Sequence, residues 1–126
     1  MVAIFPRRAY SRDMTTALGD AAFWILTTLV DGRRHGYAVL RAVAEASDDR
    51  VSLKATTLYA TLERLEATGL VATDGDEIVD GRARRYFRLT DDGRARLEVE
   101  VAQLEARARA ARHALGAARI ARTATA

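Results

Sequence analysis

The most constraining feature of this 126-residue chain is the stretch of residues 53–88, which predicts a polar helix followed directly by a basic hairpin. The expected helix places Leu58, Leu62 and Leu65 at positions i, i+4 and i+7, the spacing of one buried stripe on an α-helix. Gly69 follows, and glycine is favoured at the left-handed position where many helices end. We therefore expect one face of this helix to pack on a core and the other to stay exposed.

The exposed face of the expected helix is narrow and polar. It carries mostly short side chains: Lys54, Thr56, Thr57, Tyr59, Ala60 and Arg64. A helix with such a face fits into the major groove of DNA. Lys54, Thr56 and Thr57 are candidates for contacts with base edges, and Arg64 for a contact with phosphate. For Tyr59 two roles stay open, a contact with the phosphate or groove floor and half-buried packing.

Two strands with a basic tip are expected after this helix, at residues 70–73 and 82–89, joined by a turn at residues 74–76 and a linking stretch. Alternation along the second strand sends Arg84 and Arg85 to opposite faces, so the two cannot reach the same groove. Arg82 lies beside a glycine at the tip and is the candidate minor-groove probe. A reading helix with a basic two-stranded wing predicts a winged helix-turn-helix, an α+β fold that is mainly α.

Sequence patterns also suggest roles for three residues that precede the helix expected at residues 54–68, which we call the reading helix. Ser52 is expected to cap the N-terminus of that helix and to lie near a phosphate. Tyr37 stands at the start of a helix expected to run to about Ala46, and its role is open between a phosphate contact and the core. His35 is expected in the turn before that helix.

The first helix is expected over residues 16–30, with Thr15 or Thr16 as its N-cap. Its apolar surface is wide, which indicates packing on its own core and, on the other side, on a partner subunit. Leu18 and Ile25 are assigned to that dimer interface.

A ligand cavity is a separate expectation, with Phe23, Trp24 and Leu97 as its candidate lining. Aromatic side chains of this kind could stack on a small hydrophobic or aromatic effector. For Trp24 the alternatives of plain core or subunit interface stay open.

A long helix with a heptad seam is expected over residues 91–120, capped by Thr90. Its apolar residues alternate at spacings of four and three, which is the seam of a coiled coil: Leu97, Val101, Leu104, Ala108, Ala111, Leu115 and Ala118. A helix about 40 Å long overhangs a domain this small. We therefore predict a homodimer in which the first six of these residues face a second copy.

The expected organisation has four parts. Residues 1–14 form a flexible arm, 15–90 the winged helix-turn-helix domain, 91–120 the dimerisation helix and 121–126 a tail. In the arm, Arg7, Arg8 and Arg12 are either phosphate contacts or part of a solvated tail.

Composition narrows the class of function. The net charge of +3 is mildly basic, and the chain has no cysteine, so disulfide frameworks and thiolate metal sites are excluded. His35 and His113 lie far apart in sequence, and no glycine-rich phosphate loop precedes a helix, so we expect no enzyme, cofactor or metal site. No membrane span or secretory signal is evident, and a cytoplasmic protein is expected. The alternative to a DNA-binding regulator is a winged-helix module that binds protein.

Four motifs follow one another at regular intervals: His35-Gly36-Tyr37; Thr57-Leu58-Tyr59 with Leu62, Leu65-Glu66 and Gly69-Leu70-Val71; Gly81-Arg82 with Arg84-Arg85-Tyr86-Phe87; and Leu89-Thr90 with Gly93. In this order they resemble the PadR family of transcriptional regulators, in its compact form with a single C-terminal helix. Ala60 is a departure, because the family commonly has proline there. The resemblance implies a homodimer, a palindrome-like operator and repression relieved by a small molecule.

Overall fold

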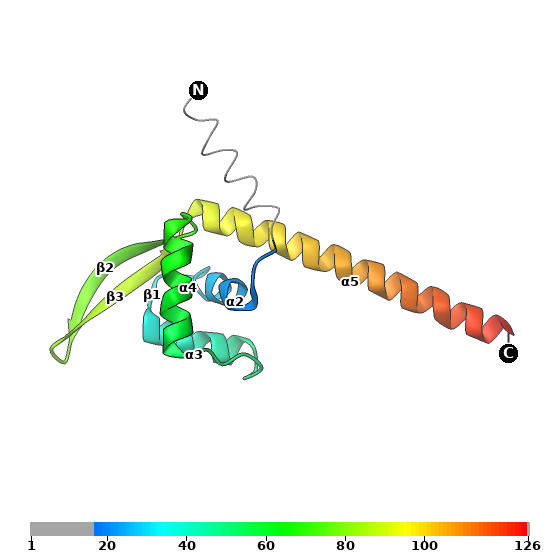
Figure 1. Cartoon of the computed structure of the whole chain (residues 1–126), viewed down its shortest axis with the longest axis horizontal. Helices are drawn as coiled ribbons and strands as arrows, with labels where there is room; N and C mark the ends of the chain where they lie inside the picture. The colour runs from blue at the N-terminus through cyan, green and yellow to red at the C-terminus, as the bar shows by residue number, and fades with distance from the viewer. Residues whose placement is uncertain (1–16, 126) are drawn as a thin grey trace, which may run out of the picture.

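Four helices and a three-stranded sheet make up residues 17–125, the part of the chain that the computed structural model describes (Figure 1). Their order is α2 (Asp20–Thr28), β1 (Arg34–His35), α3 (Gly36–Ala46), α4 (Ala55–Ala67), β2 (Val71–Val79), β3 (Arg82–Leu89) and α5 (Asp91–Thr125). The order confirms the predicted winged helix-turn-helix with a long C-terminal helix. The predicted arm, with Arg7, Arg8 and Arg12, lies outside the described residues.

Two helix ends differ from the prediction. Helix α2 begins at Asp20 behind Gly19, whose extended backbone supplies no side-chain cap, so the predicted start at Thr16 is wrong. The threonines predicted as its cap lie outside the described residues. Helix α5 continues to Thr125, so the predicted tail over residues 121–126 is also wrong. Alanine-rich sequence near the C-terminus favours the helix and explains its extra length.

The sheet is antiparallel, with strand order β1-β3-β2. The hairpin turn is Asp80-Gly81, because Val79 pairs with Arg82 and both turn residues have positive φ, as a two-residue type I′ turn requires. The predicted turn at residues 74–76 is therefore wrong. That segment is an irregularity inside β2, where the pairing register shifts between Thr73 and Asp76.

The hydrophobic core lies where the helices of the winged domain meet the base of the sheet. Leu58, Leu62 and Leu65 of α4 are all buried there, which confirms the predicted stripe. The other buried core residues lie on or directly beside α2, α3, β2, β3 and α5: Ile25, Leu26, Leu29, Val39, Val43, Leu70, Val71, Phe87 and Leu97. In α3, Tyr37 is 64% exposed and Val39 is buried instead, so the core role considered for Tyr37 is excluded.

The end of α4 is joined tightly to the start of α5. Gly69, at φ +82°, and Leu70 close α4 through backbone hydrogen bonds to Glu66 and Leu65, which is a Schellman motif. Thr90 then caps α5 as predicted: its Oγ1 accepts from the backbone N–H of Gly93 at 2.9 Å and donates to the carbonyl of Gly69. Helices α4 and α5 are thus held together as one unit.

Helix α5 has two parts with different surroundings. We call residues 91–100 the proximal segment and residues 101–125 the distal segment. The proximal segment packs on the winged domain through buried Gly93, Arg96, Leu97 and Glu100. The distal segment projects away from that domain, and no residue from 101 to 124 is buried (Figure 1).

Candidate nucleic-acid interface

The outward face of α4 is the surface predicted from the sequence. All six predicted face residues are exposed: Lys54, Thr56, Thr57, Tyr59, Ala60 and Arg64. Thr61, between them, is buried, and its hydroxyl donates to the carbonyl of Thr57 at 2.7 Å. The face is therefore a ridge of short polar side chains on a helix whose other side is fixed in the core.

The N-terminus of α4 differs from the prediction. Lys54, rather than Ser52, is the N-cap residue, and no side chain caps the helix. Ser52 is exposed in the preceding loop two residues too early for a cap, so its predicted capping role is wrong. The first-turn N–H groups of Ala55 and Thr56 consequently lack a side-chain acceptor, and such amides favour an anion.

Tyr59 combines the two roles that the sequence left open. Its side chain is 51% exposed, yet its ring lies against Gly36 in the first turn of α3. A Cβ at Gly36 would stand 2.7 Å from Cζ of Tyr59, so a larger residue at this position requires the tyrosine ring to shift. This contact, which the sequence analysis missed, fixes α3 against the exposed side of α4.

The wing has two chemically different faces. Arg85, Ala83 and Asp76 share the face that is turned toward Tyr59, and Phe87 closes that groove at its base. Nε of Arg85 lies 3.7 Å from Oδ1 of Asp76, an exposed ion pair that the sequence analysis did not anticipate. Positive charge on this face is therefore partly compensated.

The opposite face of the wing carries Arg84 and Tyr86, as strand alternation predicts. Nη1 of Arg84 lies 3.4 Å from Nε2 of His35, and the hydroxyl of Tyr86 donates to Glu77 at 3.3 Å. Arg33 stacks its guanidinium 4.2 Å from the ring centre of Tyr86. Arg82 is exposed beside the Asp80-Gly81 tip, away from these contacts.

Arg33 also braces the irregular part of the wing. Its Nη1 donates to the carbonyl of Asp74 at 2.8 Å, inside the segment where the register shifts. Its combined stacking and hydrogen bonding tie the turn after α2 to both strands of the hairpin. Nothing local in the sequence around Arg33 signals this role, because its partners Asp74 and Tyr86 lie 41 and 53 residues farther along the chain.

His35 caps α3 and reaches the wing. Its Nδ1 accepts from the backbone N–H of Ala38 at 3.2 Å, so His35 is a cap residue as well as a strand residue. Burial lowers the pKa of His35 below 6.5, and the positive charge of Arg84 lowers that pKa further. Both effects favour the neutral ring that the cap requires.

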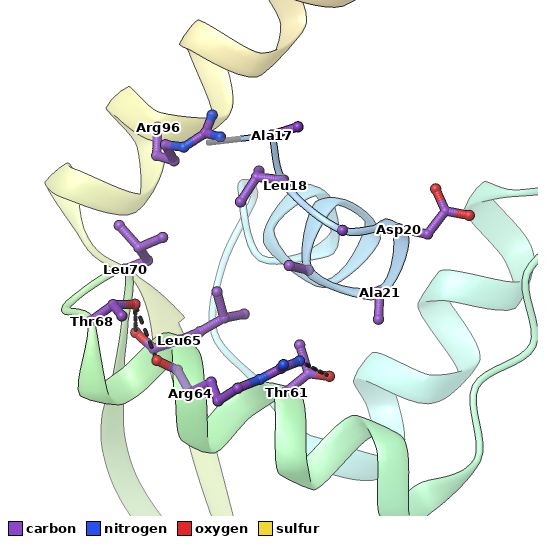
Figure 2. Close-up of a pocket in the computed structure, with 12 residues that line it drawn as sticks. Ala17, Leu18, Asp20, Ala21, Thr61, Arg64, Leu65, Thr68, Leu70 and Arg96 are labelled. Carbon is purple, nitrogen blue, oxygen red and sulfur yellow. Dashed lines mark hydrogen bonds between the residues drawn. The ribbon is translucent and has the colours of Figure 1, made fainter. Parts of the chain in front are cut away.

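A pocket lies on the side of α4 that faces α2 and α5 (Figure 2). It has a volume of about 500 Å³ and an apolar lining from Leu18, Leu65 and Leu70. Arg64 lies at this pocket, and its Nη2 donates to Oγ1 of Thr61 at 3.3 Å (Figure 2). Arg64 therefore lies between the outward face of α4 and the pocket.

The wall of that pocket contains a buried ion pair. Nη1 of Arg96 lies 3.1 Å from Oε1 of Glu100, and this oxygen also accepts from the backbone N–H of Leu18 at 3.2 Å. The pair anchors the segment before α2 to the proximal segment of α5.

The predicted ligand cavity is not formed as expected. Phe23 and Trp24 stack edge to face on each other, with ring centres 5.5 Å apart, and pack against the core. Leu97 instead lines a separate groove with Val30 and Val101. The structure therefore does not bring the three predicted residues together in one cavity.

Two residues predicted to lie at the dimer interface are buried in their own domain instead, so these two predictions are wrong. Ile25 is fully buried and Leu97 is 8% exposed, because both belong to the core of their own domain. Leu18 is half-buried against the same core. The remaining predicted seam residues are exposed on the distal segment: Val101, Leu104, Ala108, Ala111 and Leu115.

Within residues 17–125, no group of three or more His, Asp or Glu side chains is placed to hold a metal ion. No helix in this part of the chain combines the length and apolarity needed to span a membrane.

Comparison with known proteins shows which proteins this chain resembles. Residues 25–99 match the model of the transcriptional regulator PadR-like family. Transcriptional regulator Rv3488 of Mycobacterium tuberculosis is 53% identical over 53 residues, which cover 42% of this chain and 49% of that protein. The match thus spans about half the length of this relative.

Two solved structures show the same fold. A PadR family regulator from Eggerthella lenta superposes with a TM-score of 0.64 at 28% identity, covering 75% of this chain and 80% of that one. Bacillus subtilis PadR, solved in complex with operator DNA, gives a TM-score of 0.55 at 24% identity, covering 61% of this chain and 44% of that one.

Proposed function

Because this chain belongs to the PadR-like family of transcriptional regulators, we propose that it is a sequence-specific DNA-binding regulator. The observation that carries the proposal is the outward face of α4. Its exposed threonines and Lys54 offer hydrogen-bond partners, whereas Tyr59 is the one large hydrophobic side chain exposed on this face. The Bacillus relative bound to operator DNA supports the same assignment at the level of the fold.

The proposed complex contains two copies of the chain acting as a repressor in the cytoplasm. Two α4 helices enter successive major grooves about one helical turn apart. Thr56, Thr57 and Lys54 contact base edges, while Tyr37 and Arg64 contact phosphates. The uncapped N-terminus of α4, just after Ser52, adds backbone donors for a phosphate.

The wing contributes through its two faces. Arg85 lies on the face toward Tyr59 and so contacts the phosphate backbone between the major and minor grooves. Arg82, at the tip, enters the minor groove. Arg84 faces away, beside His35, and its contribution to binding is the smallest of the three arginines.

A small hydrophobic effector is part of the proposal, at a site that differs from the predicted one. The pocket of Figure 2 lies between α2, the second half of α4 and α5. Its apolar lining from Leu18, Leu65 and Leu70 suits a hydrophobic body, and Arg64 connects it to the outward face of α4. An effector there releases DNA by displacing α4 from the position that the grooves require.

The test distinguishes contacts with base edges, which depend on the DNA sequence, from contacts with phosphates, which do not. Thr56→Ala is expected to weaken binding to the selected operator by roughly 5–100-fold, while binding to random duplex changes little. Arg82→Ala is expected to weaken binding to both duplexes and to reduce the salt dependence. Binding isotherms on the two duplexes at several salt concentrations measure both effects.

Glu63→Ala provides the matched control for these isotherms, because Glu63 is also exposed on α4 but lies outside the proposed contact set. Equal losses for Thr56→Ala and Arg82→Ala on both duplexes contradict the proposed division. The absence of duplex binding at low salt points instead to a winged-helix module that binds protein.

A further inference from the structure

The irregular segment of β2 is a β-bulge, with two residues opposite one. The register of the hairpin shifts by one residue between Thr73 and Asp76. Asp74 and Gly75 consequently lie together opposite Tyr86 of β3. Gly75 has φ +86°, the left-handed conformation that glycine supplies in many bulges. A bulge bends its strand and increases the local twist, so the position of the hairpin beyond this point depends on how the bulge is held.

Arg33 contacts both sides of this bulge with one planar group. Its Nη1 donates to the carbonyl of Asp74 on β2 at 2.8 Å. The face of the same guanidinium lies 4.2 Å from the ring centre of Tyr86 on β3. A guanidinium can stack through its face while it donates from its edge, and an ammonium group has no such face. Arg33 thus clamps the two strands exactly where their pairing is interrupted.

Few other side chains hold the hairpin beyond the bulge, residues 76–85, which we call the outer wing. In the part of the chain that the structure describes, only Arg33 and His35 bring a side-chain nitrogen from outside the hairpin to within hydrogen-bond distance of it. The Nδ1 atom of His35 already accepts from the backbone N–H of Ala38. A neutral imidazole has one acceptor nitrogen, so Nε2 carries a proton and cannot accept from Arg84. Arg33 therefore makes the stronger attachment.

The outer wing carries the arginines that the proposed complex uses. It reaches away from the helices, with Arg82 exposed beside its tip (Figure 1). Across a groove from α4, it presents Ala83 and Arg85 toward Tyr59. Arg33 lies on the opposite face of the hairpin, with Tyr86. The separation between the exposed face of α4 and the wing arginines is therefore set at the bulge.

We propose that Arg33 is a positioning residue for DNA binding. By clamping the bulge, it holds the outer wing at the separation from α4 at which Arg82 and Arg85 contact DNA while α4 lies in the major groove. This inference rests on the proposed DNA-binding function and adds a residue that acts through the wing. Without the clamp the outer wing samples several positions, and binding must then restore the order that the clamp supplies.

The position of the outer wing can be measured without DNA. The chain has no cysteine, so Glu63→Cys on α4 and Ile78→Cys on the outer wing, both at exposed positions, accept one spin label each. Labelled chains diluted into an excess of unlabelled chains report distances within one copy. Electron double resonance should give a narrow distance distribution for this pair. Adding Arg33→Lys, which keeps the charge but not the planar group, should broaden it.

A double-mutant cycle tests the consequence for binding. Arg33→Lys should weaken binding to the selected operator by roughly 3–10-fold, but by less than about 2-fold in a variant that already carries Arg82→Ala and Arg85→Ala. Combined with Thr56→Ala, the two losses should multiply, because α4 keeps its place in the major groove. A general loss of folding would not distinguish between these backgrounds. Binding isotherms on the operator measure all of these variants.

Matched variants control for ring, charge and direct contact. Tyr86→Leu removes the stacked ring and should behave like Arg33→Lys, whereas Tyr86→Phe keeps the ring and should bind like the wild type. Arg88→Lys makes the same exchange at an exposed arginine near the base of β3 and should change little. If Arg33 acted only by direct contact with phosphate, lysine would supply the same charge and Arg33→Lys would keep its affinity.

The outcomes separate this inference from the function on which it rests. An unchanged distance distribution in Arg33→Lys overturns the clamp, whether or not the chain binds DNA. Equal losses with and without the two wing arginines overturn the action through the wing and leave the proposed function intact. A wild-type chain that binds no duplex at low salt overturns the proposed function, and the role of Arg33 in binding with it, even where the distance distribution broadens.

Discussion

The proximal and distal segments of α5 are one continuous helix, yet their surroundings are opposite. The proximal segment contributes Leu97, an ion pair and a glycine contact to the winged domain. The distal segment contributes no buried side chain over residues 101–124, although its apolar seam continues at the same spacing. A seam that a chain leaves unburied indicates a surface built for another molecule.

Helix α4 also has an exposed side that its own chain leaves uncovered, but that side is polar. The buried side of α4 is leucine and its exposed side is short and polar, whereas the exposed seam of the distal segment is apolar. Polar exposed faces suit a hydrated, charged partner such as DNA, and apolar ones suit another helix. The following substitutions compare the two segments directly.

The largest difference is expected from the same substitution at two glycines. A Cβ at Gly93 meets the backbone carbonyl of Leu70 and approaches Cδ1 of Leu89 to 2.7 Å, so Gly93→Ala should lower the free energy of unfolding by roughly 3–5 kcal/mol. A Cβ at Gly116, in the distal segment, meets nothing, and Gly116→Ala should stabilise the helix by about 0.5–1 kcal/mol. Urea denaturation followed by circular dichroism measures both, and similar effects would falsify the contrast.

A second comparison uses two leucines of the same seam. Leu97→Ala should lower the free energy of unfolding by about 2–4 kcal/mol, because it leaves a cavity in the core. Leu115→Ala removes a side chain that is 72% exposed in the single chain, so it should leave thermal unfolding of the monomer nearly unchanged and weaken dimerisation. Calorimetry and analytical ultracentrifugation separate the effects. An unaltered dimer Kd for Leu115→Ala argues against a partner on the distal segment.

The smallest expected effect is the pH dependence of the free energy of unfolding that comes from His35 in the winged domain. Burial and Arg84 lower the pKa of His35, so the folded state binds its proton less readily than the unfolded state. The free energy of unfolding should therefore be highest above pH 6.5 and fall as the pH drops through 6.5 toward the lowered pKa.

Two variants, one at each histidine, test whether His35 causes this pH dependence. His35→Asn keeps a capping side chain without a titrating ring and should flatten the stability profile between about pH 7.5 and 5. His113→Gln replaces an exposed histidine of the distal segment and serves as the matched control. Chemical denaturation at a series of pH values measures the slopes, and an unaltered slope in His35→Asn contradicts the capping argument.

Features set by nearby residues were predictable from the sequence. The leucine stripe of α4, the glycine that ends this helix and the threonine cap of α5 depend on residues within one or two turns. Each of these predictions is confirmed. The order of motifs was also sufficient to indicate the family that the comparisons identify.

Features set by distant pairing were not predictable. The wing contains two Asp-Gly dipeptides, at residues 74–75 and 80–81, and both glycines have positive φ. Only the pairing of Val79 with Arg82 determines which dipeptide is the hairpin turn. Strand β1 was missed for the same reason, since its two residues become a strand only through their pairing with β3.

The candidate site divides in the same way. The sequence was sufficient to identify which residues of α4 are exposed and which wing arginines lie on opposite faces. It did not indicate that Asp76 pairs with Arg85, that Arg33 braces the wing, or that Tyr59 packs on Gly36. The first contact depends on the register of the hairpin, and the other two join elements that are farther apart in the chain.

The most direct test of the account is selection of bound duplexes from a random pool by the full chain, followed by sequencing. Two α4 faces presented by a symmetric pair predict an enriched palindromic sequence whose half-sites are centred about ten base pairs apart. Enrichment of a single unrepeated half-site contradicts the paired arrangement, and no enrichment at all contradicts sequence reading by α4.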